Sequence, residues 1–280
     1  VNGNTIANFA CNQSGSGSFY GILNSTSSGS STLNFNNNTI KNISSSTTGA
    51  FYGISWGSGF IISLSGNTIK DISKSASATM YGMYSGSSSY TEQVNNNNVF
   101  NFTTTATSSS TLYGIYQLTT TTGTKSYNNN KVYNFNASGG ATIIVLRVSY
   151  GYDISMSNNE VHDLNSTGGT SATIYPYYIS SSVYGGKVSK NKGYNFSTSG
   201  TTGVCYGIYL STSSTALDVY NNMIGNLNST TYSSTTAPYL SIAGIYVSAG
   251  TVNLYNNTVF IPASSVSSGT NASTAAIYAS

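Results

Sequence analysis

One short pattern of polar and aliphatic positions recurs nine times along the chain. A copy reads Asn, any residue, an aliphatic anchor, any residue, Asn or Asp, and then Phe, Ile or Leu, with departures in the seventh and ninth copies. Successive anchors lie 29 to 35 residues apart, and such a period is typical of a repeat architecture. The opening residues of the nine copies are Asn4, Asn38, Asn67, Asn97, Asn130, Asn159, Asn191, Asn222 and Asn257. The anchors are Ile6, Ile40, Ile69, Val99, Val132, Val161, Gly193, Ile224 and Val259.

Each repeat also contains three short runs with the alternation of β-strands. One run is built on a Tyr-Gly-Ile phrase, as in Tyr52–Ile54, a second leads into the anchor, as in Leu33–Phe35, and a third follows it, as in Asn42–Ser44. Tracts of Ser, Thr and Gly separate these runs, and no helical period of 3.6 stands out. The pattern predicts an all-β chain of about nine coils of about 32 residues, with three short strands per coil.

The phrase Asn-Asn-x-Ile/Val-x-Asn-Ile/Phe covers nearly the whole chain and resembles that of right-handed parallel β-helix proteins, including the large secreted and cell-surface adhesins of Bacteroidota exported by the type IX system. The resemblance implies a right-handed parallel β-helix, or β-solenoid, in which equal strands of successive coils pair. Because one phase runs from Ile6 to Val259 without a break, we expect residues 1–280 to form a single continuous β-solenoid, an uncapped segment of a longer repeat array. This fold hosts lyases, hydrolases, tailspikes, adhesins and ice-binding proteins, so it does not decide the function.

The opening asparagines are expected to form a structural Asn ladder. Stacked once per coil, their amides can bond along the solenoid axis, and Asn also tolerates the left-handed backbone of tight turns. A second polar column, two residues after the anchors, repeats this chemistry with Asn8, Asn42, Asp71, Asn101, Asn134, Asp163, Asn195 and Asn226. The ninth copy has Ile261-Pro262 there, which predicts a local bend.

Composition excludes several classes of function. Only 5% of the residues are charged and the net charge is +3, too little to build the basic face that nucleic acid requires. The 12% aromatic content and the phased anchors argue against disorder, and no apolar run is long enough for a transmembrane helix. Cys11 and Cys205 lie about six coils apart, roughly 29 Å at about 4.8 Å per coil, so we expect no disulfide between them.

The chain offers few groups for catalysis. It has six acids, and those away from the turn column have no second carboxylate facing them in this register. The densest cluster holds Glu160, His162 and Asp163, with Lys131 and Lys192 at the position of Glu160 in the flanking coils. We interpret it as a surface Lys–Glu–Lys ladder beside an aromatic one; the alternative is a catalytic Glu–His pair or a metal site. We expect no catalytic residue, metal or cofactor, because zinc needs a third ligand.

Aromatic columns are the better candidates for binding, because contiguous exposed aromatics usually mark an interaction surface. One outward column is predicted at Phe100, Tyr133, His162 and Tyr194, and a second at Tyr84, Tyr116, Tyr209, Tyr246 and Tyr278. Their ring faces could stack on sugars, or the rings could simply stack on one another and stabilise the sheet. Tyr and Ile of the Tyr-Gly-Ile phrase would share a face if alternation were strict. The Gly column between them marks either a groove for a ligand or space required by neighbouring side chains.

These observations favour a non-catalytic structural or adhesive segment of a large extracellular bacterial surface protein or filament. Surface polysaccharide or other segments of the same fibre are the expected partners. The first alternative is a β-helix polysaccharide lyase, hydrolase or tailspike-like protein that uses Glu160, His162, Lys131 and Lys192. The second is an ice-binding solenoid, for which the column Thr5, Thr39 and Thr68 breaks off too early, at Asn98.

Overall fold

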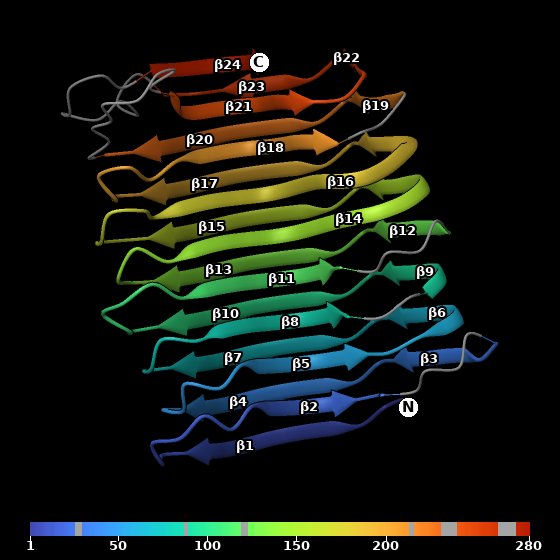
Figure 1. Ribbon diagram of the computed structural model, residues 1–280, viewed down its shortest axis with the longest axis vertical. Coiled ribbons are helices and arrows are strands. Elements are labelled where there is room, and N and C mark those ends of the chain that lie inside the picture. Colours follow the sequence, from blue (N-terminus) through green and yellow to red (C-terminus); the bar gives the residue numbers. More distant parts are fainter. Residues whose placement is uncertain (26–29, 87–88, 119–122, 213–215, 231–239, 263–272) are drawn as a thin grey trace.

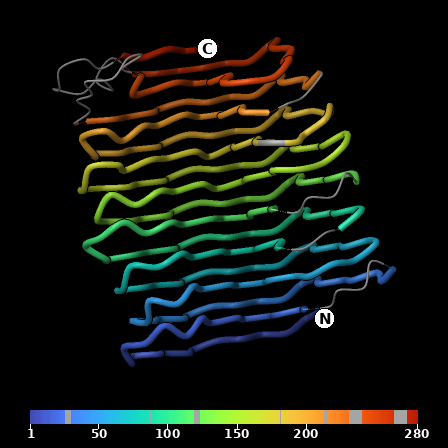
Figure 2. The backbone as a smooth tube through the Cα atoms, in the orientation of Figure 1, coloured from blue at the N-terminus to red at the C-terminus, as the bar shows by residue number. Residues whose placement is uncertain are grey.

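The computed structural model describes residues 1–25, 30–86, 89–118, 123–212, 216–230, 240–262 and 273–280. Every strand pairing in it is parallel, and the strands wind coil after coil into a β-solenoid of about eight turns with a repeat near 31 residues (Figures 1 and 2). The described residues contain no α-helix. The predicted all-β parallel solenoid is confirmed.

One sheet of nine strands carries the anchors. It is formed, in spatial order, by β1 (Thr5–Cys11), β4 (Thr39–Ser45), β7 (Thr68–Lys74), β10 (Asn98–Thr104), β13 (Lys131–Ala137), β15 (Glu160–Ser166), β17 (Lys192–Thr198), β20 (Met223–Ser229) and β23 (Thr258–Phe260). The last strand, β23, stops at Phe260 after three residues, where β20 has seven, just before the Ile261-Pro262 step.

A second sheet of fifteen strands forms the rest of each coil. Its first run contains β2 (Phe19–Leu23), β5 (Phe51–Trp56), β8 (Thr79–Ser85), β11 (Thr111–Gln117), β14 (Thr142–Ser157), β16 (Thr173–Ser189), β18 (Cys205–Thr212), β21 (Leu240–Ala249) and β24 (Ser273–Ala279). Its second run contains β3 (Thr32–Asn36), β6 (Gly59–Ser65), β9 (Ser89–Asn95), β12 (Thr124–Asn128), β19 (Leu217–Tyr220) and β22 (Val252–Tyr255). Strands β14 and β16 pass through both runs, so their coils have two strands and the other coils three.

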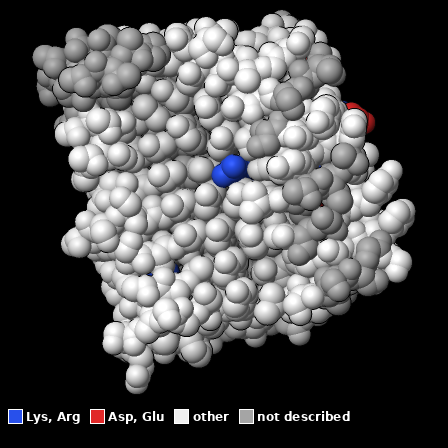
Figure 3. All heavy atoms as spheres, in the orientation of Figure 1, with Lys and Arg blue, Asp and Glu red and all other residues white. Residues whose placement is uncertain are grey.

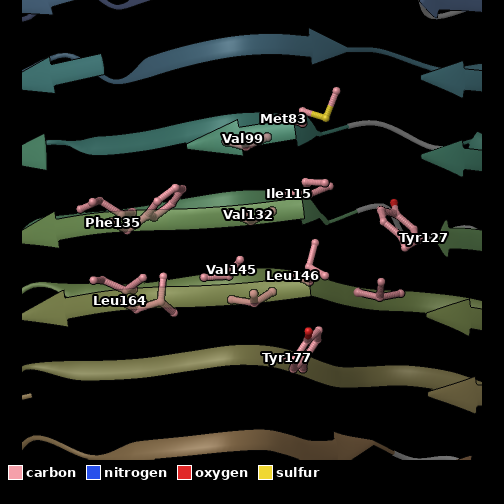
Figure 4. Packing of buried hydrophobic residues seen from close by; sticks show 14 of the residues in the cluster. Met83, Val99, Ile115, Tyr127, Val132, Phe135, Val145, Leu146, Leu164 and Tyr177 are labelled. Carbon is pink, nitrogen blue, oxygen red and sulfur yellow. The ribbon is translucent and has the colours of Figure 1, made fainter. Parts of the chain in front are cut away.

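The register predicted from the anchors is confirmed residue by residue. Val99 pairs with Val132 and Val132 with Val161, and the same one-to-one pairing runs from β1 to β23. The anchors from Ile40 to Val161, and Ile224, are fully buried in the core between the sheets (Figure 4). Each repeat except the seventh, whose anchor is Gly193, therefore contributes one aliphatic side chain to the interior column.

The seventh anchor, Gly193, is compensated from the opposite sheet. Tyr177 of β16 is fully buried, and a Cβ added to Gly193 would lie 3.1 Å from its ring. The tyrosine hydroxyl donates to the carbonyl oxygens of Asn159, at 3.1 Å, and Lys192, at 2.8 Å. A large side chain at Tyr177, a position that holds Leu146 one coil earlier, fills the volume that a missing anchor would leave.

The Asn ladder is present from Asn4 to Asn257. In each step the backbone N–H and the side-chain amide of one asparagine both donate to Oδ1 of the next, as from Asn97 to Asn130 at 3.0 Å each. The same side-chain amide also donates to a carbonyl oxygen of a neighbouring strand, such as Leu64 for Asn97. The inner seven members, Asn38 to Asn222, are at most 1% exposed, so these bonds satisfy polar groups that have no access to water.

The left-handed backbone does not lie where the ladder was expected to have it. Positive φ occurs one residue earlier, as at Asn129 with φ 57°, and again in the second column, as at Asn134 with φ 57°. In the second column each amide donates to the preceding coil, as from Asn134 to Asn101 at 2.7 Å. Asp71 and Asp163 cannot donate when ionised. Each carboxylate instead contacts the basic side chain that precedes it: the Lys70 ammonium lies 3.6 Å from Asp71, and Nδ1 of His162 lies 2.8 Å from Asp163.

The Gly column faces the interior, which decides between a groove for a ligand and space required by neighbouring side chains. A Cβ on Gly82 would lie 2.5 Å from the carbonyl oxygen of Gly114 and 2.6 Å from the Val99 anchor. The sheets approach too closely there for any side chain, so the column is required by packing. Strict alternation also fails at this point, because Tyr52 is half-buried while Ile54 is fully buried. The expectation that Tyr and Ile share a face is therefore wrong.

Candidate functional site: the aromatic columns

The first predicted column exists and its rings are stacked on one another. On the outer side of the nine-stranded sheet the centroid distances are 4.7 Å for Phe100 and Tyr133, 4.8 Å for Tyr133 and His162, and 4.9 Å for His162 and Tyr194. The planes are within 8° of parallel. All four residues are half-buried. Because each inner ring is covered on both faces, this column offers a ligand ring edges and polar atoms instead of the free faces that sugar stacking needs.

Lysines line this column. Lys70 lies over Phe100 at 5.5 Å, Lys131 over Tyr133 at 5.3 Å, and Lys192 over Tyr194 at 4.8 Å. Lys131 also forms the predicted ion pair with Glu160, at 3.2 Å. Lys192 is the register partner of Glu160 on the other side, as the predicted Lys–Glu–Lys ladder requires, but its ammonium makes a cation–π contact with Tyr194 in place of a second ion pair.

Glu160 and Asp163 are held as ionised acceptors. Burial acts to raise the pKa of Glu160, but the hydroxyl of Tyr194, at 2.9 Å, and the Lys131 ammonium bring it below its ordinary value. Burial likewise acts to raise the pKa of Asp163, and its bonds to Asn195 and His162 lower it. Burial and the Glu160 bond raise the pKa of Tyr194 to about 12. A carboxylate with a lowered pKa is poorly suited to act as a general acid near neutral pH.

The cluster does not assemble a metal site. Nδ1 of His162 lies 2.8 Å from Asp163, while Glu160 is bonded to Tyr194 and Lys131. Among the residues that the structure describes, no three His, Cys, Asp or Glu side chains converge on one point. Both cysteines are free, Cys205 buried and Cys11 partly exposed, as the spacing predicts.

The second predicted column belongs to a larger aromatic surface. On the first run of the fifteen-stranded sheet Tyr84 pairs with Tyr116, and Tyr209 pairs with Tyr246 and, through it, with Tyr278. A parallel column beside it begins Tyr20, Tyr52, Tyr81 and Tyr113, with centroids 4.6 to 4.9 Å apart. We call the outward tyrosines of this run, together with Arg147, the tyrosine face: Tyr20, Tyr52, Tyr81, Tyr84, Tyr113, Tyr116, Arg147, Tyr175, Tyr178, Tyr206, Tyr209, Tyr246 and Tyr278.

The tyrosine face is less exposed than the sequence suggested. Tyr84, Tyr209 and Tyr246 are half-buried and Tyr116 is 6% exposed, because neighbouring rings cover them. Burial raises the pKa of Tyr116 to about 12, against the opposing effect of Arg147. The hydroxyls of Tyr84 and Tyr116, whose pKa values burial raises, therefore stay protonated at neutral pH and can donate as well as accept hydrogen bonds.

Arg147 interrupts the second tyrosine column, and the sequence analysis did not single it out as a binding residue. It pairs in register with Tyr116 on one side and Tyr178 on the other, and its guanidinium lies 4.8 Å from the centre of each ring. The signal that could have identified it is its register: the only arginine of the sequence falls at a column position that tyrosine holds in the neighbouring coils, from Tyr84 to Tyr278.

A buried polar network was also missed. Inside the coils Glu92 accepts from Ser85 at 2.9 Å and from Tyr127 at 2.7 Å, and the fully buried Lys125 ammonium lies 3.7 Å from it. Desolvation lowers the pKa of Lys125, and the charge of Glu92 opposes that shift. The pair sits in adjacent coils, since Glu92 and Lys125 are register partners of β9 and β12. Its location in the interior gives it a structural role.

Comparison with protein-family models, with curated proteins and with solved structures gives no match for this chain. In the described part of the chain, no helix has the length and apolar character needed to cross a membrane. The fold and the aromatic columns are thus the observations on which a function can be argued.

Proposed function

We propose that this chain is a rigid, non-catalytic rod within a large extracellular bacterial surface protein or filament, with aromatic columns that contact surface polysaccharide. The observation that carries the proposal is the uninterrupted Asn ladder. Its buried asparagines join each coil to the next with three hydrogen bonds per step, so these polar groups hold the coils together along the solenoid axis. A stack of coils held in this way resists bending, and further repeats can lengthen it without a change in the repeat itself.

The outer surface supports a contact role. Charge is sparse over the face seen in Figure 3, which leaves aromatic rings and hydroxyls as its recognition chemistry. Rings stacked over many coils form a rigid array, and tyrosine supplies contact area with little loss of side-chain entropy. The carboxylates of the nine-stranded sheet support the non-catalytic part, because Glu160 and Asp163 are bonded within the column.

The test is retention of the purified chain on polysaccharide-coated surfaces. We expect wild type to be retained and the double variant Tyr209→Ala, Tyr246→Ala to be retained at least several-fold less. Tyr220→Ala is the matched control, since Tyr220 stacks on Tyr255 at 4.9 Å outside the tyrosine face. Absence of wild-type retention, or equal retention of the double variant, would contradict the contact role.

The same polysaccharides serve to test catalysis. We expect no release of new reducing ends or unsaturated products during prolonged incubation. Release that disappeared in Glu160→Ala would replace the rod proposal by the polysaccharide-processing alternative.

A further inference from the structure

The tyrosine face carries a single charge along its whole described length. The first-run strands of the fifteen-stranded sheet contain no Lys, Asp or Glu, and Arg147 is their one ionisable group with a permanent charge. Here the first runs of β14 and β16 are residues 142–148 and 173–180. Arg147 is therefore the one permanent charge on an otherwise uncharged aromatic surface, and it lies in the middle of the second tyrosine column.

That cation is not neutralised within the chain. All six carboxylate side chains are among the described residues, and their contacts with basic side chains are with Lys70, Lys125, Lys131 and His162, not with Arg147. Arg147 is half-buried, and its Nε is buried without a hydrogen-bond partner. A partly desolvated charge with no counter-charge favours an anion beside it.

The geometry restricts what that anion can be. The ring centres of Tyr116 and Tyr178 each lie 4.8 Å from the guanidinium carbon, one on either side, and Tyr113 hydrogen-bonds to the group. Because Nε is buried, a ligand would meet the terminal nitrogens of the guanidinium edge. An arginine edge matches a planar carboxylate, to which it donates two parallel hydrogen bonds. The tyrosines beside it add ring edges and neutral hydroxyls, which suit the hydroxyls and C–H groups of a sugar better than a second charge.

We propose that the tyrosine face binds an acidic polysaccharide, with a uronate carboxylate on Arg147 and the neighbouring sugars on the flanking tyrosines. This inference rests on the proposed polysaccharide contact and narrows it to uronate-bearing chains. It differs from the contact role by requiring a charge-dependent site at one residue.

The experiment measures binding of the full chain to a soluble polyuronate, to a neutral glucan of similar length and to polyglutamate. Variants are Arg147→Met, which keeps the bulk without the charge, and Arg147→Lys, which keeps the charge without the planar edge. The control is Lys187→Met, an exposed cation on the second run of β16, away from the tyrosine face. Thermal unfolding establishes that each variant is folded.

We expect wild type to prefer polyuronate over both other polymers. Arg147→Met should lose at least tenfold in polyuronate affinity, Arg147→Lys should lose less, and Lys187→Met should match wild type. Added salt should weaken wild-type binding and leave Arg147→Met nearly unchanged. If Arg147→Met does not fold, Arg147→Lys and the salt dependence of wild type decide the question.

Five outcomes would overturn the inference. Polyuronate binding by Arg147→Met as tight as that of wild type would show that Arg147 forms no binding site. A loss of affinity in Lys187→Met equal to that in Arg147→Met would show that the attraction is general electrostatics. Wild-type binding to polyglutamate as tight as to polyuronate would make the ligand an acidic peptide. Equal binding of neutral glucan refutes the uronate preference but leaves the proposed contact role intact, whereas no binding of either polysaccharide contradicts both.

Discussion

At the residue scale, two backbone positions per coil depend on one amino-acid type. The residue before each ladder asparagine, and the residue two beyond each of the first eight anchors, has a positive φ between 53° and 69°, where most side chains are strained. Asn fills most of these positions because its short amide tolerates that conformation and also bonds to its neighbours. The two positions differ in burial from the ladder between them, which predicts unequal sensitivity to mutation.

Asn130→Ala is expected to destabilise the fold by about 2–4 kcal/mol, since it leaves several buried polar groups without partners. The backbone N–H of Asn97 would lose its acceptor, and the carbonyl oxygen of Val94 its donor. Asn129→Gly is the control: it is exposed, and glycine adopts its φ of 57° readily. Chemical denaturation should show a loss for Asn130→Ala alone, and equal losses would contradict the ladder's role.

Lys190 is the one residue other than Asn or Gly at the left-handed position before the ladder, with φ 56°. Lys190→Asn should stabilise the chain by about 1 kcal/mol, because asparagine accepts this conformation at lower cost. The midpoint of chemical unfolding measures the gain. Lys187→Asn, at an exposed strand position, should give none. A midpoint that falls in Lys190→Asn would show that the lysine makes a compensating contact.

At the element scale, the side chains of facing strands are matched in size across the core. The anchor of β17 is Gly193, and Tyr177 of β16 supplies the missing volume. The close approach at the Gly column belongs to the same scale, because it sets how far apart the two sheets can lie. Neither feature is visible within one strand, since each depends on the side chain that faces it.

Gly193→Val and Tyr177→Leu should each destabilise the fold, and their combination should restore part of the loss. Gly193→Val overpacks the core at a cost of about 1–3 kcal/mol, and Tyr177→Leu leaves a cavity and removes both hydrogen bonds of the tyrosine hydroxyl. The double variant restores the size pattern of the previous coil, Val161 opposite Leu146. A double-mutant cycle should give a coupling of about 1–3 kcal/mol, and additive losses would exclude size matching.

The parts of the fold that repeat could be predicted from the sequence. The register of the anchors, the Asn ladder and the column from Phe100 to Tyr194 follow from the period alone, and the structure confirms them. Facing directions could not be predicted, because alternation is broken at glycines such as Gly53 and at left-handed residues such as Asn42. The partnership of Glu92 with Lys125 was missed because a charged pair in the interior contradicts the usual preference for the surface.

At the scale of the whole molecule, the tyrosines make stability depend on alkaline pH. Burial raises the pKa of many of them, to about 12 for Tyr116 and well above the ordinary value of 10.0 for Tyr127 and Tyr177. In the unfolded chain they would ionise near pH 10. A group whose pKa is raised by folding contributes stability that is complete below its unfolded pKa and is lost as pH rises through the folded value.

We therefore expect the melting temperature to stay high up to about pH 9 and to fall steeply above about pH 10, as the unfolded chain releases protons that the folded one retains. Buried Lys74 and Lys125, whose pKa values desolvation lowers, act in the opposite sense just below pH 10.5 and are outnumbered. Melting curves followed by circular dichroism, with tyrosinate absorbance in parallel, measure this dependence. A fold that persists above pH 12 with its tyrosines ionised would contradict the burial of these hydroxyls.

The two amide columns of the solenoid donate their hydrogen bonds in opposite directions. In the buried ladder Asn97 donates to the following coil, whereas in the second column Asn134 donates to the preceding one. The bonds between asparagine side chains therefore run in opposite senses in the two columns, unlike the peptide dipoles of an α-helix, which all point one way. The chain has one direction in sequence, yet in a longer stack of such coils these two series of bonds would stay opposed at every coil.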